Sequence, residues 1–237
     1  YALGGYYTGI NGWEFSVEGY YKDMRNVLEY KDGVSFFGSS SGWENKVEMG
    51  KGRSAGIEFM AQKTAGKTTG WLSYTLSKSD RKFTKGGINN GEWFPYKYDR
   101  RHSINLTINH KFSDRIDIGA SWVFYTGGTS TIPEEKTTVI RPHNGANNGF
   151  LWYGTYDNTN SSPTIGDVSY IEHRNNFRLP ASHRLNLGVN FNKKTKHGMR
   201  TWNISLYNAY NAMNPAWVYR GHNKQGLSVI KKYTLLP

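Results

Sequence analysis

The side chains of this sequence that could carry chemistry are its histidines, carboxylates and glycine pairs. Seven histidines are present, but no pair shows metal-ligand spacing on one expected element. Glu14 and Glu18 stand four residues apart on one strand face and could mimic a catalytic carboxylate pair, but charges that face a wet interior explain them more simply. Neither Gly4-Gly5 nor Gly86-Gly87 precedes the helix and Lys-Ser/Thr of a phosphate loop. We therefore expect no enzyme, no cofactor and no metal site.

A dense charged cluster, Asp99-Arg100-Arg101-His102, follows a stretch that reads as a loop. Such a cluster could bind an anionic ligand through charge-assisted hydrogen bonds. The alternative is a solvated rim with local ion pairs, and we favour it because exposed ion pairs of this kind are weak.

Aromatic residues in or beside the expected long loops carry the best binding hypothesis. Aromatic side chains give large contact areas at low entropy cost, so we expect them to help capture a ligand. The alternative is that they pack the loops against each other. The candidate ligand-binding residues are Trp93, Tyr96, Arg101, Tyr125, Trp152, Tyr153 and Tyr156.

Strands must position these residues. The stretch 94–128 reads as two long strands joined by the tight turn Phe112-Ser113-Asp114-Arg115. Apolar and polar residues alternate from 103 to 109 and again from 116 to 125, and a period of two indicates a strand. Strands of about ten residues are longer than usual, and this length crosses a bilayer at a tilt.

The same alternation predicts about eight strands, joined by short turns and long loops in strict alternation. We expect long loops at 24–53, 80–96 and 129–180, the last with a small hairpin built from 138–140 and 150–153, a loop at 212–228 and a return strand at 229–237. Outer-membrane barrels sort their connections in this way, whereas a soluble meander has no reason to. The expected strands are 1–8, 13–23, 54–62, 70–79, 103–109, 116–125, 183–192 and 200–210.

Aromatic residues also cluster near both ends of the expected strands. Two aromatic belts, about one bilayer apart, would follow. Beside the short turns lie Trp13, Trp71, Phe112, Phe191 and Trp202, and beside the long loops lie Tyr21, Phe124 and Tyr125.

Composition narrows the choice of protein class. The chain has no Cys, which excludes disulfides and thiolate chemistry, and only 37% hydrophobic residues beside 15% aromatics. These values fit a transmembrane barrel, in which one face of each strand is apolar, and also a soluble β-sandwich. The net charge is +12, but Lys and Arg are scattered over turns and loops, so we expect no nucleic-acid partner.

Nine short motifs, in this order, resemble the TonB-dependent outer-membrane receptors of Bacteroidetes-type bacteria. The similarity runs over nearly the whole chain. The motifs are Glu18-Gly19-Tyr20-Tyr21-Lys22-Asp23, Ser54-Ala55-Gly56-Ile57-Glu58, WLSYTLS from Trp71, Phe94-Pro95, Tyr98-Asp99-Arg100-Arg101-His102, Phe177-Arg178-Leu179-Pro180, His183-Arg184-Leu185, Tyr207-Asn208-Ala209-Tyr210-Asn211 and Asn214-Pro215.

The resemblance implies an all-β, antiparallel up-and-down segment of a barrel of about 22 strands that encloses a plug. Residues 1–237 would be the C-terminal portion of that barrel, without the plug and most of the closing strand. Short turns would be periplasmic and long loops extracellular. The alternative is a secreted or cell-surface β-sheet module that binds glycans or mediates adhesion.

The implied function is import of a scarce nutrient, such as an iron–siderophore complex, across the outer membrane of a Gram-negative bacterium. Implied partners are the plug domain, the TonB complex through a missing N-terminal part, lipopolysaccharide phosphates at the charged cluster, and a surface lipoprotein. The ending typical of starch-type glycan importers is not matched, so sugar import is not favoured.

Overall fold

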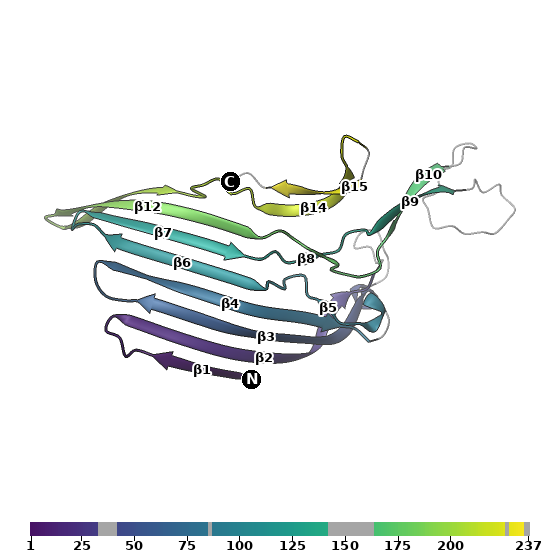
Figure 1. Cartoon of the computed structure of the whole chain (residues 1–237), viewed down its shortest axis with the longest axis horizontal. Coiled ribbons are helices and arrows are strands. Elements are labelled where there is room, and N and C mark those ends of the chain that lie inside the picture. Colours follow the sequence, from purple (N-terminus) through teal and green to yellow (C-terminus); the bar gives the residue numbers. More distant parts are fainter. Residues whose placement is uncertain (33–41, 85–86, 142–163, 226–227, 235–237) are drawn as a thin grey trace.

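The computed structural model describes residues 1–32, 42–84, 87–141, 164–225 and 228–234. One antiparallel sheet dominates, with strand order β1-β2-β3-β4-β6-β7-β12-β13 and the short β5 added to β4 (Figure 1). Neighbours in sequence are neighbours in space, which confirms the up-and-down prediction. Its strands are β1 (Ala2–Tyr7), β2 (Trp13–Tyr30), β3 (Val47–Lys63), β4 (Thr68–Lys82), β5 (Phe94–Pro95), β6 (His102–Lys111), β7 (Ile116–Tyr125), β12 (Ser182–Thr195) and β13 (Gly198–Leu206).

The connections are sorted by length, as expected. The turns β1–β2, β3–β4, β6–β7 and β12–β13 lie at one end of the sheet, on the left of Figure 1. The connections 31–46, 83–101 and 126–181 leave from the other end, which we call the long-connection rim. Two short 3₁₀ helices, η1 (Trp43–Lys46) and η2 (Asn89–Gly91), lie in these connections. No helix in the described ranges is long and apolar enough to cross a membrane.

The expected loop at 24–53 is wrong at both ends, because residues 24–30 and 47–53 are strand. The chain continues in pairs from Met24 opposite Gly52 to Tyr30 opposite Val47. Asn26 interrupts the ladder as a bulge, with a left-handed φ of 57°. An extra residue shifts the alternation by one position, and this shift hides the period of two in the sequence.

Two further expectations need correction. The expected loop at 212–228 contains β14 (Pro215–His222), which pairs with β15 (Ser228–Thr234) in a separate hairpin. The long insert forms its own hairpin, but β9 (Glu135–Arg141) pairs with β10 (Thr164–Tyr170), while residues 150–153 lie outside the described residues. Nearer the sheet, β8 (Thr129–Ser130) pairs with β11 (Phe177–Arg178).

Strand register gives the sheet one apolar and one polar face. Residues directly opposite each other in a ladder share a face. One row across the sheet is Val17, Phe59, Tyr74, Ile104 and Phe124; its polar neighbour is Glu18, Glu58, Thr75, Ser103 and Tyr125.

One aromatic residue of the expected belt at the short turns lies on the other face. Trp71 is directly opposite Thr107, in a polar row, and so does not belong with Trp202 on the apolar face. The apolar residues of β4 include Leu72 and Tyr74, at even-numbered positions, so Trp71 falls on the opposite face.

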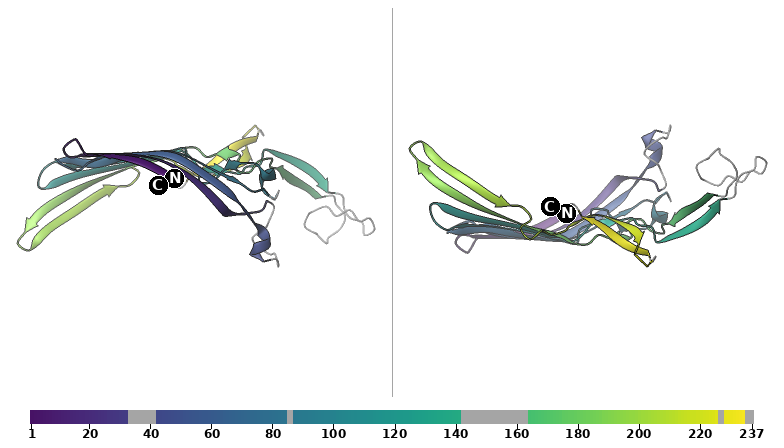
Figure 2. Two further views of the ribbon diagram at one scale, coloured as in Figure 1. Left: turned by 90° about the horizontal axis from the view of Figure 1, so that it is seen from below. Right: turned by 90° about the horizontal axis from the view of Figure 1, so that it is seen from above.

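The sheet is a single curved layer (Figure 2). Large side chains on its apolar face stay open, for example Phe59 at 48% and Ile204 at 68% exposure. The buried hydrophobic cluster of the described residues is small, consisting of Phe83, Ile88 and Phe94 with Val27 against it. An apolar face this open suits lipid contact rather than packing against a second sheet.

Candidate ligand site at the long-connection rim

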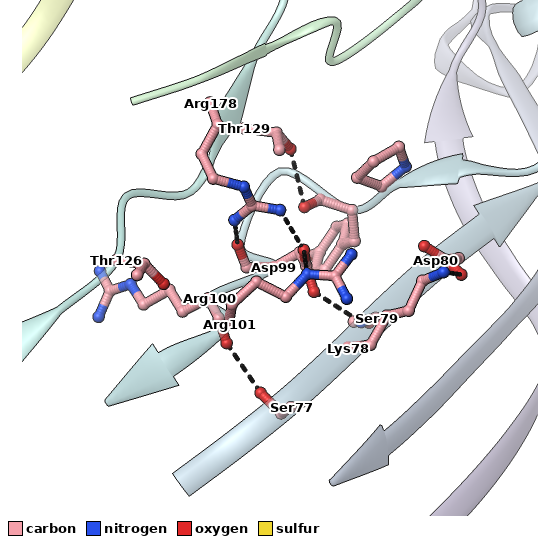
Figure 3. A network of polar contacts seen from close by, with 12 residues as sticks. Ser77, Lys78, Ser79, Asp80, Asp99, Arg100, Arg101, Thr126, Thr129 and Arg178 are labelled. Atoms are coloured by element: carbon pink, nitrogen blue, oxygen red, sulfur yellow. Dashed lines mark hydrogen bonds and ion pairs between the residues drawn. The ribbon is translucent and has the colours of Figure 1, made fainter. Parts of the chain in front are cut away.

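Asp99 is the centre of a polar network at the long-connection rim (Figure 3). It is 1% exposed, and its backbone N–H closes a turn by donating to the Tyr96 carbonyl at 2.7 Å. Its carboxylate accepts hydrogen bonds from the Ser79 backbone N–H at 2.7 Å and from Arg178 Nη2 at 2.5 Å. Arg101 Nε lies 3.1 Å from the same carboxylate. The expected solvated rim is therefore wrong at its first residue, whose charge is buried between two guanidinium groups.

Arg178 joins three segments that are far apart in sequence. Besides the carboxylate, its Nη1 donates to the carbonyls of Asp99 at 2.7 Å and of Gly127 at 2.9 Å. The chain passes this point through two glycines, because a Cβ on Gly127 would lie 2.1 Å from the Leu179 carbonyl oxygen and one on Gly128 would lie 2.4 Å from that of Lys97. The exit of β7 and the entry to β12 are thus held together at one point.

Each described aromatic residue of the expected site lies against an arginine. The guanidinium carbons of Arg81 and Arg100 lie 3.6 and 4.0 Å from the ring centres of Tyr96 and Tyr125. Arg81 is held in turn by Glu29 at 3.0 Å. Cation–π contacts of this kind fix the ring orientation. Tyr96 is thus held by Arg81 of β4, and Tyr125 by Arg100 of the β5–β6 connection.

Trp93 differs from the two tyrosines in the face it occupies. Its ring lies 4.3 Å from the guanidinium carbon of Arg53, whose register position is on the apolar face. Tyr125 and Arg81 have register positions on the polar face. The expected residues Trp152, Tyr153 and Tyr156 lie outside the described residues.

Sequence reasoning missed a second anchor, at 174–176. Arg174 Nε lies 3.0 Å from Asp32, and the Arg174 backbone N–H donates to the Asn89 side chain at 2.9 Å. Asn175, with a φ of 55°, donates from Nδ2 to the Pro95 carbonyl at 2.7 Å. Arg-Asn-Asn before a Phe-Arg pair was the available signal, since asparagine tolerates the left-handed conformation better than most residues.

Polar side chains cover the polar face near the short turns. Asn192 donates to Asp117 at 2.6 Å, and Asn203 donates to Asn190 at 2.7 Å. On the other half of the sheet, Glu18 stands directly opposite Glu58. This face can meet water or a polar partner but not lipid, because hydrocarbon offers no hydrogen bonds.

Three of the described histidines contact a hydroxyl group through Nδ1, whereas His173 Nε2 lies 3.8 Å from the Glu172 carboxylate. His102 Nδ1 lies 2.9 Å from the Tyr74 hydroxyl, and His183 Nδ1 lies 2.8 Å from that of Tyr210. Among the described residues, no group of three or more His, Cys, Asp and Glu is placed to hold a metal ion. What the rim offers is ordered aromatic and cationic surface, which suits binding rather than bond chemistry.

Residues 1–215 match the family model described as "TonB dependent receptor-like, beta-barrel". No curated protein matches the chain.

Proposed function

Because the chain belongs to the TonB-dependent receptors, a family of outer-membrane transporters rather than enzymes, we propose that it helps import a scarce, large nutrient such as an iron–siderophore complex. Energy for this uptake comes through TonB. Membership of a transporter family argues against the alternative of a secreted or cell-surface binding module. Residues 1–237 then form the C-terminal portion of the barrel wall.

The observation that carries the proposal is that hydrogen bonds and ion pairs hold the long-connection rim in one ordered arrangement. Buried Asp99 and the Arg174 anchor hold the bases of three connections. Binding to ordered groups loses less conformational entropy than binding to mobile ones. A long-connection rim with ordered aromatic rings is therefore suited to binding a ligand that is present at low concentration.

Capture falls to Tyr96 and Tyr125, with Arg100 on the Tyr125 ring and Arg101 on the nearby Asp99 carboxylate. Both rings lie against guanidinium groups, so the mouth presents flat apolar surface next to positive charge. Such a surface suits an anionic aromatic ligand, a class that includes many ferric chelates. Trp93, packed on Arg53, contributes to the outer margin, and we keep Trp152, Tyr153 and Tyr156 of the long insert as further candidates for ligand contact.

The polar face supplies the contact with a plug domain. The opposed carboxylates of Glu18 and Glu58 repel each other unless a cation approaches, and plug arginines or lysines would provide it. The TonB complex acts through a segment N-terminal to these strands, and a surface lipoprotein could cover the long connections.

Deletion of the gene tests the transport proposal. The deletion strain is grown under iron limitation on single ferric chelates, one nutrient at a time, and is complemented with the intact receptor. We expect growth to fail on one chelate class and to return on complementation. Unchanged growth on every iron source would reject iron import, and a defect on another nutrient would redirect the assignment of the ligand.

A further inference from the structure

Three cations stand in one row across neighbouring strands, on the apolar side of the sheet. Arg25 of β2 is directly opposite Lys51 of β3, and Lys51 is directly opposite Lys82 of β4. Directly opposed residues have Cβ atoms about 5 Å apart, and like charges in these positions destabilise a sheet. We call these three residues the cation row.

Neighbouring carboxylates do not neutralise the cation row. Asp23 lies 3.7 Å from Arg25, but the Arg25 side chain remains 81% exposed. The other carboxylate on this side, Asp80, is 6% exposed and already lies 3.0 Å from Arg53 and 3.4 Å from Lys78. Within the described ranges, no ion pair forms at Lys51 or Lys82. The arrangement leaves a net positive patch.

The position of the cation row relates it to the membrane surface. It lies at the long-connection rim, on the same face as Phe59 and Tyr74. Two rows with charged residues follow towards the short turns, first Asp23, Arg53 and Asp80 and then Tyr21, Ala55 and Lys78. The first row that is apolar on all three strands is Gly19, Ile57 and Leu76. It is six residues from Lys51, or about 20 Å along the strand, and a strand tilt of about 45° reduces this to about 14 Å in height. Cations at this height lie where phosphate groups meet the hydrocarbon layer.

We propose that the cation row binds the phosphate groups of lipopolysaccharide. The inference rests on the outer-membrane placement in the proposed function, with long connections extracellular. The outer leaflet there is a phosphorylated glycolipid whose acyl chains would cover the apolar face. One phosphate can approach two adjacent cations, because neighbouring strands lie about 5 Å apart. The repulsion within the row is then relieved by the lipid, which gives a physical reason for the three like charges in register.

Purified intact receptor in detergent tests the proposal directly. Wild type and the triple variant R25Q/K51Q/K82Q are titrated with diphosphoryl lipid A and with the enzymatically dephosphorylated lipid, and bound lipid is counted by native mass spectrometry. We expect the triple variant to bind diphosphoryl lipid A about tenfold more weakly or worse, and wild type to lose a similar factor when the phosphates are removed.

Two variants control for charge and folding. K193Q/R200Q removes an opposed cation pair of the apolar face at the short-turn end and is expected to leave lipid A binding unchanged. K51R/K82R keeps the charges and is expected to bind as wild type does. Heat-dependent gel migration confirms that each barrel is folded.

Equal lipid A binding by folded wild type and R25Q/K51Q/K82Q would overturn the proposal, as would equal loss in K193Q/R200Q or indifference of wild type to dephosphorylation. Because the measurement uses no nutrient, it fails or succeeds independently of the cargo assigned to the receptor.

Discussion

Arg178 Nη2 donates to the Asp99 carboxylate at 2.5 Å, although 79 positions separate the two residues in the chain. Removing one partner of a buried ion pair typically costs 3–5 kcal/mol. The Arg178 side chain is 32% exposed, so the cost for Asp99→Asn should fall below that range, at about 2 kcal/mol. Hydrogen exchange of peptides covering 96–101 and 174–181 in the intact receptor measures it, and we expect exchange about tenfold faster or more.

An exposed ion pair provides the control for this experiment. Asp114 lies 3.4 Å from Lys111 and its side chain is 90% exposed, so Asp114→Asn should leave exchange unchanged. Unaltered protection in Asp99→Asn would mean that other contacts hold the rim together.

Loss of the two ordered rings at the mouth should weaken uptake. For Tyr96→Ala combined with Tyr125→Ala we expect a loss of about 1–3 kcal/mol in ligand binding, or roughly a tenfold rise in the concentration that gives half-maximal uptake. Uptake of the ferric chelate identified by the deletion strain is the measurement. Tyr21→Leu, on the apolar face, should behave as wild type, and wild-type uptake by the double variant would exclude these rings from capture.

The bulge at Asn26 should depend on left-handed backbone geometry. With φ at 57°, Asn26→Gly should be nearly neutral, whereas the β-branched side chain of Asn26→Val should cost about 1–3 kcal/mol. Hydrogen exchange over 24–30 and 47–52 would report the difference. Equal protection in the two variants would show that the bulge tolerates any side chain.

Single thiols can establish which end of the sheet faces outwards. The chain has no cysteine, so Thr84→Cys in a long connection and Asp114→Cys in a short turn each introduce a unique thiol within it. A maleimide that cannot cross membranes should label position 84 in intact cells, and position 114 only after the outer membrane is permeabilised. The reverse pattern would invert the orientation and move the cation row to the inner leaflet.

Strand prediction from the sequence succeeded where the alternation is unbroken. The strand expected at 116–125 has the bounds of β7 (Ile116–Tyr125), because apolar residues repeat every second position between a tight turn and a Gly-Gly pair. It failed at Asn26, where one extra residue shifts the alternation of apolar and polar positions. It also failed at 212–228, where Pro215 begins β14 although proline usually argues against a strand.

Long-range polar contacts at the rim could not be predicted in the same way. The cluster at Asp99 is visible in the sequence, but its partner Arg178 follows no period that would place it nearby. The cation row was hidden for a related reason, since Lys51 and Lys82 become neighbours only once the register of β3 and β4 is known.

The side chain of Asn176 clasps the backbone of Ile132 from both sides, accepting from its N–H at 3.0 Å and donating to its carbonyl at 2.9 Å. The hairpin of β9 and β10 lies outside both this contact and the Arg174 anchor. The sheet therefore does not depend on what is carried beyond it. The hairpin could therefore be replaced, in evolution or by protein engineering, to change which ligand is recognised without changing the strands that cross the membrane.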